Sequence, residues 1–142
     1  MKALKRLLTI KKMAKKCFVS VDVEPDLGTK DQYQGVENID KVLSIFKNYS
    51  IPAVLFVTGQ VLELYPEKFK KIAEQGFEIA CHGYTHTFWN KLNQEQRLAE
   101  VDKFKNIYQQ LFNKQPAGFR APSHVIDKQG LQLLKGHGFK YD

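Results

Sequence analysis

Hydrophobic and polar residues alternate from position 19 to position 24, within a segment over 18–24 that is rich in valine. Ser20, Asp22 and Glu24 are the polar residues of this pattern. Successive side chains of a β-strand point to opposite faces, so the alternation predicts a strand with these three side chains on one face and the valines on the other. Two carboxylates on the same face of a strand can reach a common site.

Other apolar segments predict the remaining elements. Short runs predict strands over 53–57, 77–81 and 117–120, and a further strand that begins at 139. Gly59 is expected to stop the second strand. Apolar residues at helical spacing predict helices within 36–46, 66–76, 93–111 and 127–136.

The ends of these helices carry the residue types that helix ends prefer. Pro66 suits a first turn and Gly76 a C-cap. Asn93 together with Gln96 resembles a capping box, and Asp127 is a good N-cap residue. Each signal coincides with a boundary of the hydrophobic pattern, which supports the division of the chain into these helices.

Strands and helices therefore take turns along the chain, and such alternation predicts an α/β fold with parallel strands joined by right-handed crossovers. The chain of 142 residues holds about five βα units. A closed barrel of eight such units typically needs about 250 residues. We expect the N-terminal part of a (β/α) barrel, incomplete at its C-terminus, or else a small open sheet.

The net charge of +7 is unevenly distributed. Residues 1–16 hold seven of the 22 Lys and Arg residues and no acid, which leaves 15 cations against 15 acids over 17–142. This division predicts one domain over 17–142 and a basic head over 1–16. The head could be an arm for an anionic surface, a disordered extension, or a start assigned upstream of a true Met13. Because the domain itself is neutral, we expect no nucleic-acid partner.

The chain contains two cysteines, and their positions bear on its location. Cys17 begins the first expected strand and Cys81 ends the third, so parallel strands would place them at opposite ends of the sheet, too far apart for a disulfide. We expect reduced, buried thiols. The sequence has neither an apolar secretory segment in its head nor about 20 consecutive apolar residues, so we predict no membrane span and a cytoplasmic location.

Chemically active residues follow three of the expected strands. Asp22 and Glu24 end the first, His82 follows the third with His86 four residues later, and Arg120 follows the fourth. Ends of parallel strands meet at one edge of a sheet, where functional groups of α/β folds gather. Two imidazoles and one carboxylate can hold a divalent metal with an open position for water, and a second carboxylate can act as base.

Each of these motifs has a structural explanation when it is taken alone. Histidines four residues apart also occur as surface neighbours, two carboxylates can mark a solvated strand end, and Arg120-Ala121-Pro122 can be a simple turn. Their shared placement at one edge favours a functional site.

In these residues the chain resembles the polysaccharide deacetylase or NodB-homology family, carbohydrate esterase family 4. The resemblance covers residues 17–142 and rests on three motifs in the family's order. They are Ser20-Val21-Asp22-Val23-Glu24, His82-Gly83-Tyr84-Thr85-His86 and Arg120-Ala121-Pro122-Ser123.

The resemblance implies a distorted (β/α) barrel that hydrolyses acetamides of N-acetylated carbohydrates with a divalent metal, for which Zn²⁺ is the expected ion. It implies that Asp22 is the base, that Arg120 orients Asp22, and that the backbone N–H of Ser123 holds the oxyanion. His82 and His86 would be metal ligands. The family commonly has a second Asp where this chain has Val23, so the third ligand would be Glu24, as in a variant branch.

One family feature has no counterpart here. Relatives carry a late histidine that acts as general acid, and neither His124 nor His137 matches it. We therefore expect residues 1–142 alone to turn over chitooligosaccharides poorly. Three aromatic residues beside the histidine motif could stack on a sugar ring or could simply pack. They are Tyr84, Phe88 and Trp89.

Other functions compatible with the residues are a catalytically impaired fragment that binds metal or sugar, and a hydrolase of small cyclic amides or ureides. A two-histidine, one-carboxylate iron oxygenase fits the ligands, but the α/β alternation argues against it. The sequence does not indicate an oligomeric state.

Overall fold

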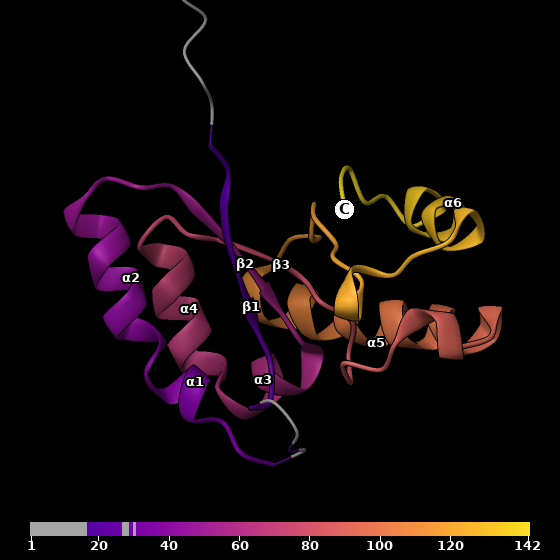
Figure 1. Ribbon diagram of the computed structural model, residues 1–142, viewed down its shortest axis with the longest axis horizontal. Coiled ribbons are helices and arrows are strands. Elements are labelled where there is room, and N and C mark those ends of the chain that lie inside the picture. Colours follow the sequence, from indigo (N-terminus) through magenta and orange to yellow (C-terminus); the bar gives the residue numbers. More distant parts are fainter. Residues whose placement is uncertain (1–16, 27–28, 30) are drawn as a thin grey trace, which may run out of the picture.

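A parallel sheet lies at the centre of the computed structural model, which describes residues 17–26, 29 and 31–142. Its strands follow in the order β1 (Val19–Val23), β2 (Ala53–Val57) and β3 (Glu78–Cys81) (Figure 1). The register pairs Asp22 with Phe56 and Phe56 with Ala80, so these three residues share one face. The strands predicted over 18–24, 53–57 and 77–81 are confirmed to within one residue at each end.

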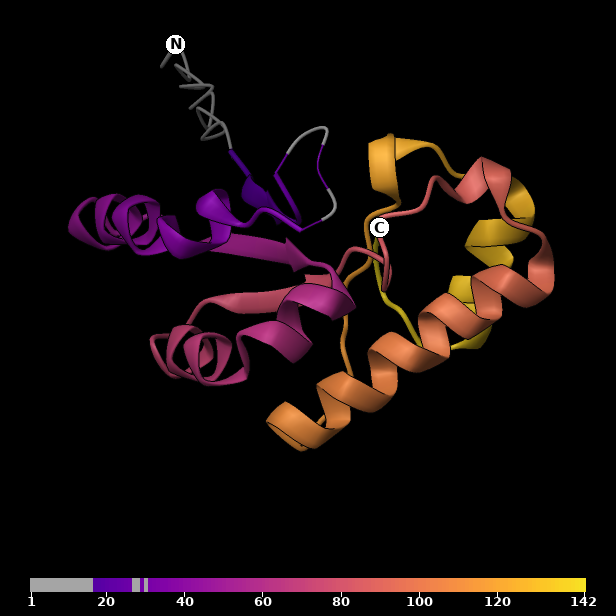
Figure 2. The same cartoon turned by 90° about the horizontal axis from the view of Figure 1, so that it is seen from below.

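Helices connect the strands and follow them along the chain. They are α1 (Gln34–Glu37), α2 (Ile39–Asn48), α3 (Gly59–Leu64), α4 (Pro66–Glu74), α5 (Gln94–Phe112) and α6 (Lys128–Gly136), with short 3₁₀ turns at Trp89–Lys91 and Pro122–His124. Figures 1 and 2 show α2 and α4 at one end of the molecule and α6 at the other, with the long helix α5 running from beside the sheet to the end that holds α6.

Three predicted helix ends are confirmed, two by side-chain hydrogen bonds and one by a glycine conformation. Asn93 and Gln96 form a capping box at the start of α5. The Asp127 side chain accepts a hydrogen bond from the Gly130 N–H at the start of α6. Gly76 follows α4 with a φ of +92°, a left-handed conformation that glycine adopts without steric cost.

Two helix predictions need correction. The single helix predicted over 36–46 is divided at Asn38, whose φ and ψ of −92° and 1° separate α1 from α2. Gly59 does not merely stop β2, because it opens α3. A Cβ at Gly59 would lie 2.5 Å from the Tyr84 ring. The glycine at this position therefore allows the start of α3 to lie close to Tyr84.

The fourth and fifth predicted strands are reduced to single bridges. Phe119 pairs with Cys81 and Tyr141 pairs with Gly118, both in parallel, so the sheet direction continues beyond β3. The segment over 117–121 lies between Pro116 and Pro122. Proline has no N–H to donate to a ladder, which limits pairing at both ends of this short segment.

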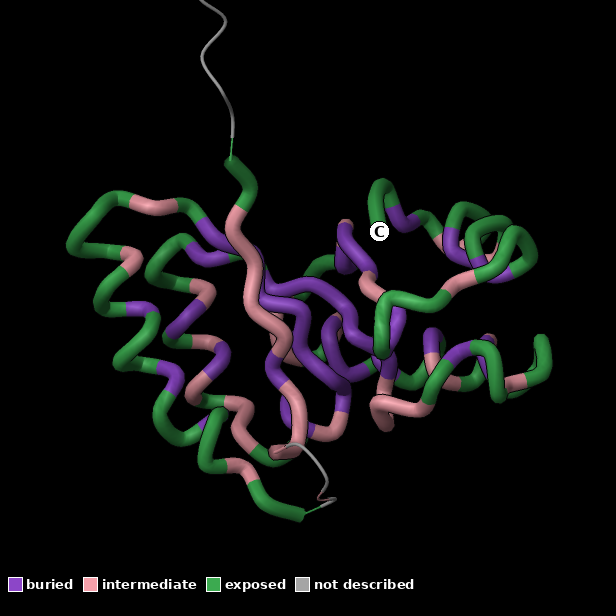
Figure 3. The backbone as a smooth tube through the Cα atoms, viewed as in Figure 1, coloured by how far each residue is buried: buried purple, intermediate pink, exposed green. Residues whose placement is uncertain are grey.

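The main core lies between the sheet and its helices. It includes Leu55, Val57, Ile79 and Cys81 from the strands, together with residues from each of the helices named above. A small second cluster, Val54, Phe56 and Ala80, lies on the other face of the sheet. Figure 3 shows the tube buried through β2 and most of β3 and half-buried along most of β1.

Both cysteines are free, which confirms the prediction that they form no disulfide. Cys81 is buried as predicted, but Cys17 is exposed, because it precedes β1 and no partner strand covers it. In the described part of the chain no helix combines the length and the apolar character needed to cross a membrane. The basic head predicted over 1–16 lies outside the described residues, and the cytoplasmic location stays a prediction.

Candidate metal centre and base

The polar face of β1 meets the end of β3 at one edge of the sheet. Glu24 directly follows β1, and His82 directly follows β3. His86 lies four residues further along, at the end of a tight loop in which Gly83 and His86 have φ values of +77° and +58°. The loop thus turns the second imidazole back toward the first, as the spacing predicts.

Three side chains converge on a common point. The Nε2 atom of His86 lies 2.5 Å from Glu24 Oε2, and the Nε2 atom of His82 lies 3.1 Å from the same oxygen. One ligand atom from each residue lies within 4.8 Å of the others. Two imidazole nitrogens and one carboxylate oxygen are a donor set that suits Zn²⁺. The residues therefore fit a divalent metal at the position that the sequence predicts.

A second contact fixes the orientation of the His82 ring. Its Nδ1 atom lies 2.8 Å from the backbone carbonyl oxygen of Arg120, and the side chain is 1% exposed. A carbonyl oxygen only accepts hydrogen bonds, so Nδ1 carries the proton and donates it. With Nδ1 protonated, the neutral ring carries its lone pair on Nε2, which is the tautomer that a metal ligand needs, whereas in the absence of an ion a proton on Nε2 donates to Glu24.

The carboxyl group of Glu24 is held in its ionised form. Burial by itself would raise its pKa, but hydrogen bonds with His82 and His86, together with the charges of these rings, lower the pKa to about 2. Hydrogen bonds and positive charge favour the carboxylate over the acid. The group is therefore anionic near neutral pH, as a metal ligand must be.

Asp22 is held beside this cluster by Arg120. The Nη1 atom of Arg120 lies 2.5 Å from Asp22 Oδ1, and its Nη2 donates to Ser20 Oγ at 2.8 Å. The guanidinium carbon lies 3.9 Å from the centroid of the Phe56 ring, a cation–π geometry. The strand alternation predicts Ser20 on this face but gives it no role, and Phe56 has no signal in the sequence beyond its place in an apolar strand.

The second oxygen of Asp22 faces two imidazoles. Oδ2 lies 4.0 Å from His82 Nε2 and 3.5 Å from His124 Nε2. His124 belongs to the turn Pro122–His124, in which Ser123 and His124 have φ values of +58° and +57°, and both are exposed. The sequence indicates no role for His124; the turn brings it to Asp22. His137 lies elsewhere, at the end of α6, 3.6 Å from Asp102.

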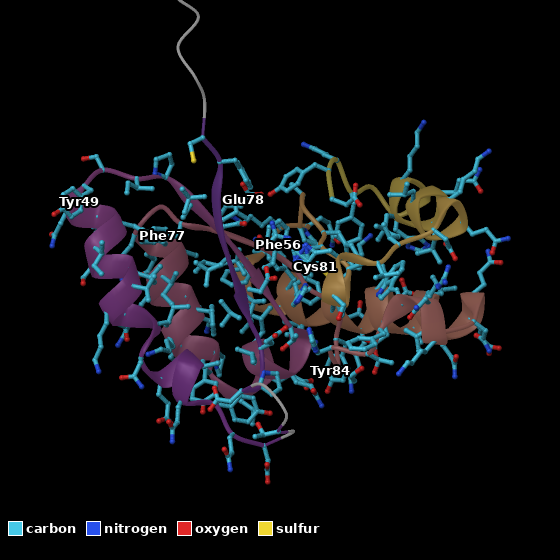
Figure 4. The ribbon with its side chains drawn as sticks, viewed as in Figure 1. Tyr49, Phe56, Phe77, Glu78, Cys81 and Tyr84 are labelled. Carbon is cyan, nitrogen blue, oxygen red and sulfur yellow. The ribbon has the colours of Figure 1, made fainter. Side chains whose placement is uncertain are left out.

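The three candidate aromatic residues differ in their surroundings. Figure 4 places Tyr84 beyond the end of β3 that carries Cys81 and away from Glu78. The Tyr84 ring packs against Gly59 and lies 3.8 Å from Lys103 Nζ. Trp89 is 1% exposed, whereas Phe88 is 40% exposed with its ring 6.4 Å from the His86 ring. Of the three, Phe88 keeps a ring surface beside the cluster that a ligand can reach.

Comparison with known proteins identifies a family that matches this chain. The family model described as polysaccharide deacetylase matches residues 11–141, so the match starts within the basic head, before the boundary predicted at residue 17. A peptidoglycan deacetylase of Helicobacter pylori is 32% identical over 118 residues. That alignment covers 83% of this chain and 40% of the relative, so the chain spans well under half of the longer protein.

Solved structures share the fold. A pseudoenzyme of carbohydrate esterase family 4 from Bacillus anthracis superposes with a TM-score of 0.76 at 18% identity, over 87% of this chain and 41% of its own. A peptidoglycan N-acetylglucosamine deacetylase in complex with an N-hydroxybenzamide gives a TM-score of 0.73 at 25% identity, over 87% and 54%. The prediction of part of a (β/α) barrel with parallel strands is confirmed.

Proposed function

The chain belongs to the polysaccharide deacetylase family, and we propose from this membership that it hydrolyses N-acetyl groups of an N-acetylated carbohydrate with one bound Zn²⁺ ion. The observation that carries the proposal is the convergence of Glu24, His82 and His86, whose ligand atoms lie within 4.8 Å of one another. Asp22 lies directly beside them, with Oδ2 at 4.0 Å from His82 Nε2.

In this proposal Glu24, His82 and His86 would hold the metal, which when bound would act as a Lewis acid toward the acetamide carbonyl and would lower the pKa of water. The protein itself has to accept a proton from the attacking water and to stabilise the negative charge that develops on the carbonyl oxygen. Arg120 occupies Asp22 Oδ1, so Oδ2 is the oxygen left to accept the proton of the attacking water. The backbone N–H of Ser123 would donate to the oxyanion of the tetrahedral species.

The expected substrate is an N-acetylated sugar of peptidoglycan or a related polysaccharide. Two of the similar proteins carry peptidoglycan deacetylase in their names, and one of these has 32% identity to the chain. The exposed ring of Phe88 beside His86 offers a surface against which a sugar ring can pack. The N-hydroxybenzamide bound to the second protein is a hydroxamate, a class of compounds that chelates metal ions.

Metal content tests the proposal directly. Purified protein should contain about one Zn²⁺ per chain, and His82→Ala should lose most of it, because one of three ligands is gone. His137→Ala is the matched control, since His137 lies at the end of α6 against Asp102 and should leave the zinc content unchanged. Equal zinc content in wild type and His82→Ala would contradict the proposed metal site.

A binding protein without turnover is the second candidate, and one observation favours it. The similar fold from Bacillus anthracis is a pseudoenzyme, so this fold occurs without activity. Release of acetate from N-acetylchitooligosaccharides and from peptidoglycan fragments separates the two candidates. Zinc binding and sugar binding without acetate release would support the non-enzymatic role.

A further inference from the structure

The loop between the two metal-site histidines is held by a carboxylate from a different part of the chain. Glu100 Oε2 accepts hydrogen bonds from the backbone N–H groups of Tyr84 and Thr85, at 2.6 and 2.9 Å. Glu100 Oε1 accepts from the Thr85 hydroxyl at 2.7 Å. Both oxygens of one side chain therefore bind the residues that separate His82 from His86.

The carbonyl groups of the same loop accept hydrogen bonds from the start of α3. The Gly59 N–H donates to Gly83 O at 3.0 Å, and the Gln60 N–H donates to Tyr84 O at 3.1 Å. Residues 59 and 60 open α3, and Glu100 lies on α5. The loop is thus fixed between two helices, with N–H groups that face a carboxylate and carbonyl groups that face a helix start.

The loop needs such support because its backbone is costly. His86 has a φ of +58°. Residues other than glycine rarely adopt this backbone conformation, which costs of order 1–3 kcal/mol. At Gly83, with a φ of +77°, a Cβ would lie 3.4 Å from Glu100 Oε2, so the carboxylate packs directly against the loop. Hydrogen bonds to an ionised acceptor are about twice as strong as neutral ones and can offset this strain.

Glu100 is itself well anchored. The capping box of Asn93 and Gln96 fixes the start of α5. One turn before Glu100, Arg97 donates to Trp89 O at 3.0 Å and pairs with Asp127 through both carboxylate oxygens at 2.8 and 2.9 Å. The carboxylate is therefore presented from a rigid helix and not from a mobile loop.

We propose that Glu100 is a positioning residue that holds the loop in its metal-binding conformation before the ion binds. The inference rests on the proposed metal site and adds to it. A ligand that is already ordered binds its ion without the cost of ordering, so Glu100 raises zinc affinity through His86, which it does not touch. Residues that orient ligands in this way typically change metal affinity by about 10- to 100-fold when they are replaced.

The test compares Glu100→Gln with Glu95→Gln. The first substitution keeps the size of the side chain but removes its charge and replaces one of its two acceptor oxygens by an NH₂ group, so the three hydrogen bonds to a carboxylate are weakened or lost. Glu95 is exposed in the first turn of the same helix and loses the same charge. Zinc affinity is measured by competition with a chromophoric chelator, at a temperature at which circular dichroism shows folded protein. We expect about 10- to 100-fold weaker binding for Glu100→Gln and an unchanged constant for Glu95→Gln.

Hydrogen exchange of the metal-free proteins provides an independent measurement. The amides of Tyr84 and Thr85 should exchange faster in Glu100→Gln than in wild type. If Glu100→Gln does not fold, Thr85→Val is the second variant. It keeps both backbone contacts of Glu100, removes the hydroxyl contacts with Glu100 at 2.7 Å and with Thr87 at 2.8 Å, and should weaken zinc binding by a smaller factor. A role in stability alone would lower the melting temperature and leave the zinc constant of the folded protein unchanged.

The outcomes separate this inference from the proposed function. Zinc binding by wild type with equal constants for both glutamine variants would overturn the role of Glu100 and leave the metal site intact. No zinc binding by wild type, with faster exchange at residues 84 and 85 in Glu100→Gln, would overturn the metal site and the inferred gain in affinity, while Glu100 would still hold the loop.

Discussion

The two faces of the sheet differ in what fills them. On one face Leu55, Val57 and Phe119 pack with the helices in a continuous apolar core. On the other, three apolar residues lie beside Arg120 and Tyr141. The Tyr141 hydroxyl donates to Glu78, and the Arg120 guanidinium covers Phe56. The first face is therefore held by burial of apolar area, and the second by directional contacts between polar groups.

One short strand, β1, contributes to the apolar core with one face and to the candidate site with the other. Val19, Val21 and Val23 face the helices, while Asp22 reaches Arg120 on the other side and Glu24 reaches the two histidines. Substitutions on the helix face should change stability and leave the site chemistry intact. Substitutions on the polar face should change chemistry with little effect on stability.

The largest expected effect lies on the polar face. Asp22→Asn removes the proposed base, and general base catalysis typically contributes about 10²–10⁴-fold, so acetate release should fall by that factor. Zinc content should not change, since Glu24 and the histidines remain. The rate of acetate release and the zinc content are measured on the same preparation. Loss of zinc in this variant would mean that Asp22 is the ligand and that Glu24 needs another role.

The next effect lies on the helix face. Phe119 is fully buried, with ring centroids 4.6 Å from Trp89 and 5.6 Å from Phe139, so Phe119→Ala should lower the free energy of unfolding by about 3–5 kcal/mol. Urea denaturation monitored by circular dichroism gives this value. Phe18→Ala is the control, because Phe18 is 68% exposed and should change stability by less than about 0.5 kcal/mol. Similar losses in both variants would contradict the proposed difference between the faces.

A smaller effect is expected where the polar face holds Arg120. Ser20→Ala removes the acceptor for Arg120 Nη2 at 2.8 Å and should lower the free energy of unfolding by about 1 kcal/mol. Ser44→Ala is the control: it removes an exposed hydrogen bond from the Ser44 hydroxyl to the Lys41 carbonyl oxygen on α2, and should change the free energy of unfolding by less than about 0.5 kcal/mol. If Arg120 needs Ser20 to orient Asp22, acetate release should fall in Ser20→Ala while the zinc constant stays the same. A change in the zinc constant instead would show that the two halves of the site are coupled.

Several features of the site followed from sequence patterns, and others did not. The alternation around Asp22 and the spacing of His82 and His86 were sufficient to place these groups at one edge of the sheet. The contact of His124 with Asp22 depends on two successive left-handed residues in a turn, which no pattern indicates. Glu100 has the appearance of an ordinary helix residue, and only the packing of α5 brings it to the loop.

The sequence by itself determined β1 to β3, most of the helices, the two faces of β1 and the residue types of the proposed metal ligands, because periodicity and residue chemistry are local properties. Tertiary structure decided which distant groups meet. Arg120 reaches Asp22 across 98 residues of sequence, and Glu24 reaches His82 across 58. Such contacts depend on strand register and on crossover geometry, which join the edges of separate strands. Local patterns indicate which groups share an edge of the sheet, but not the individual contacts that these groups make.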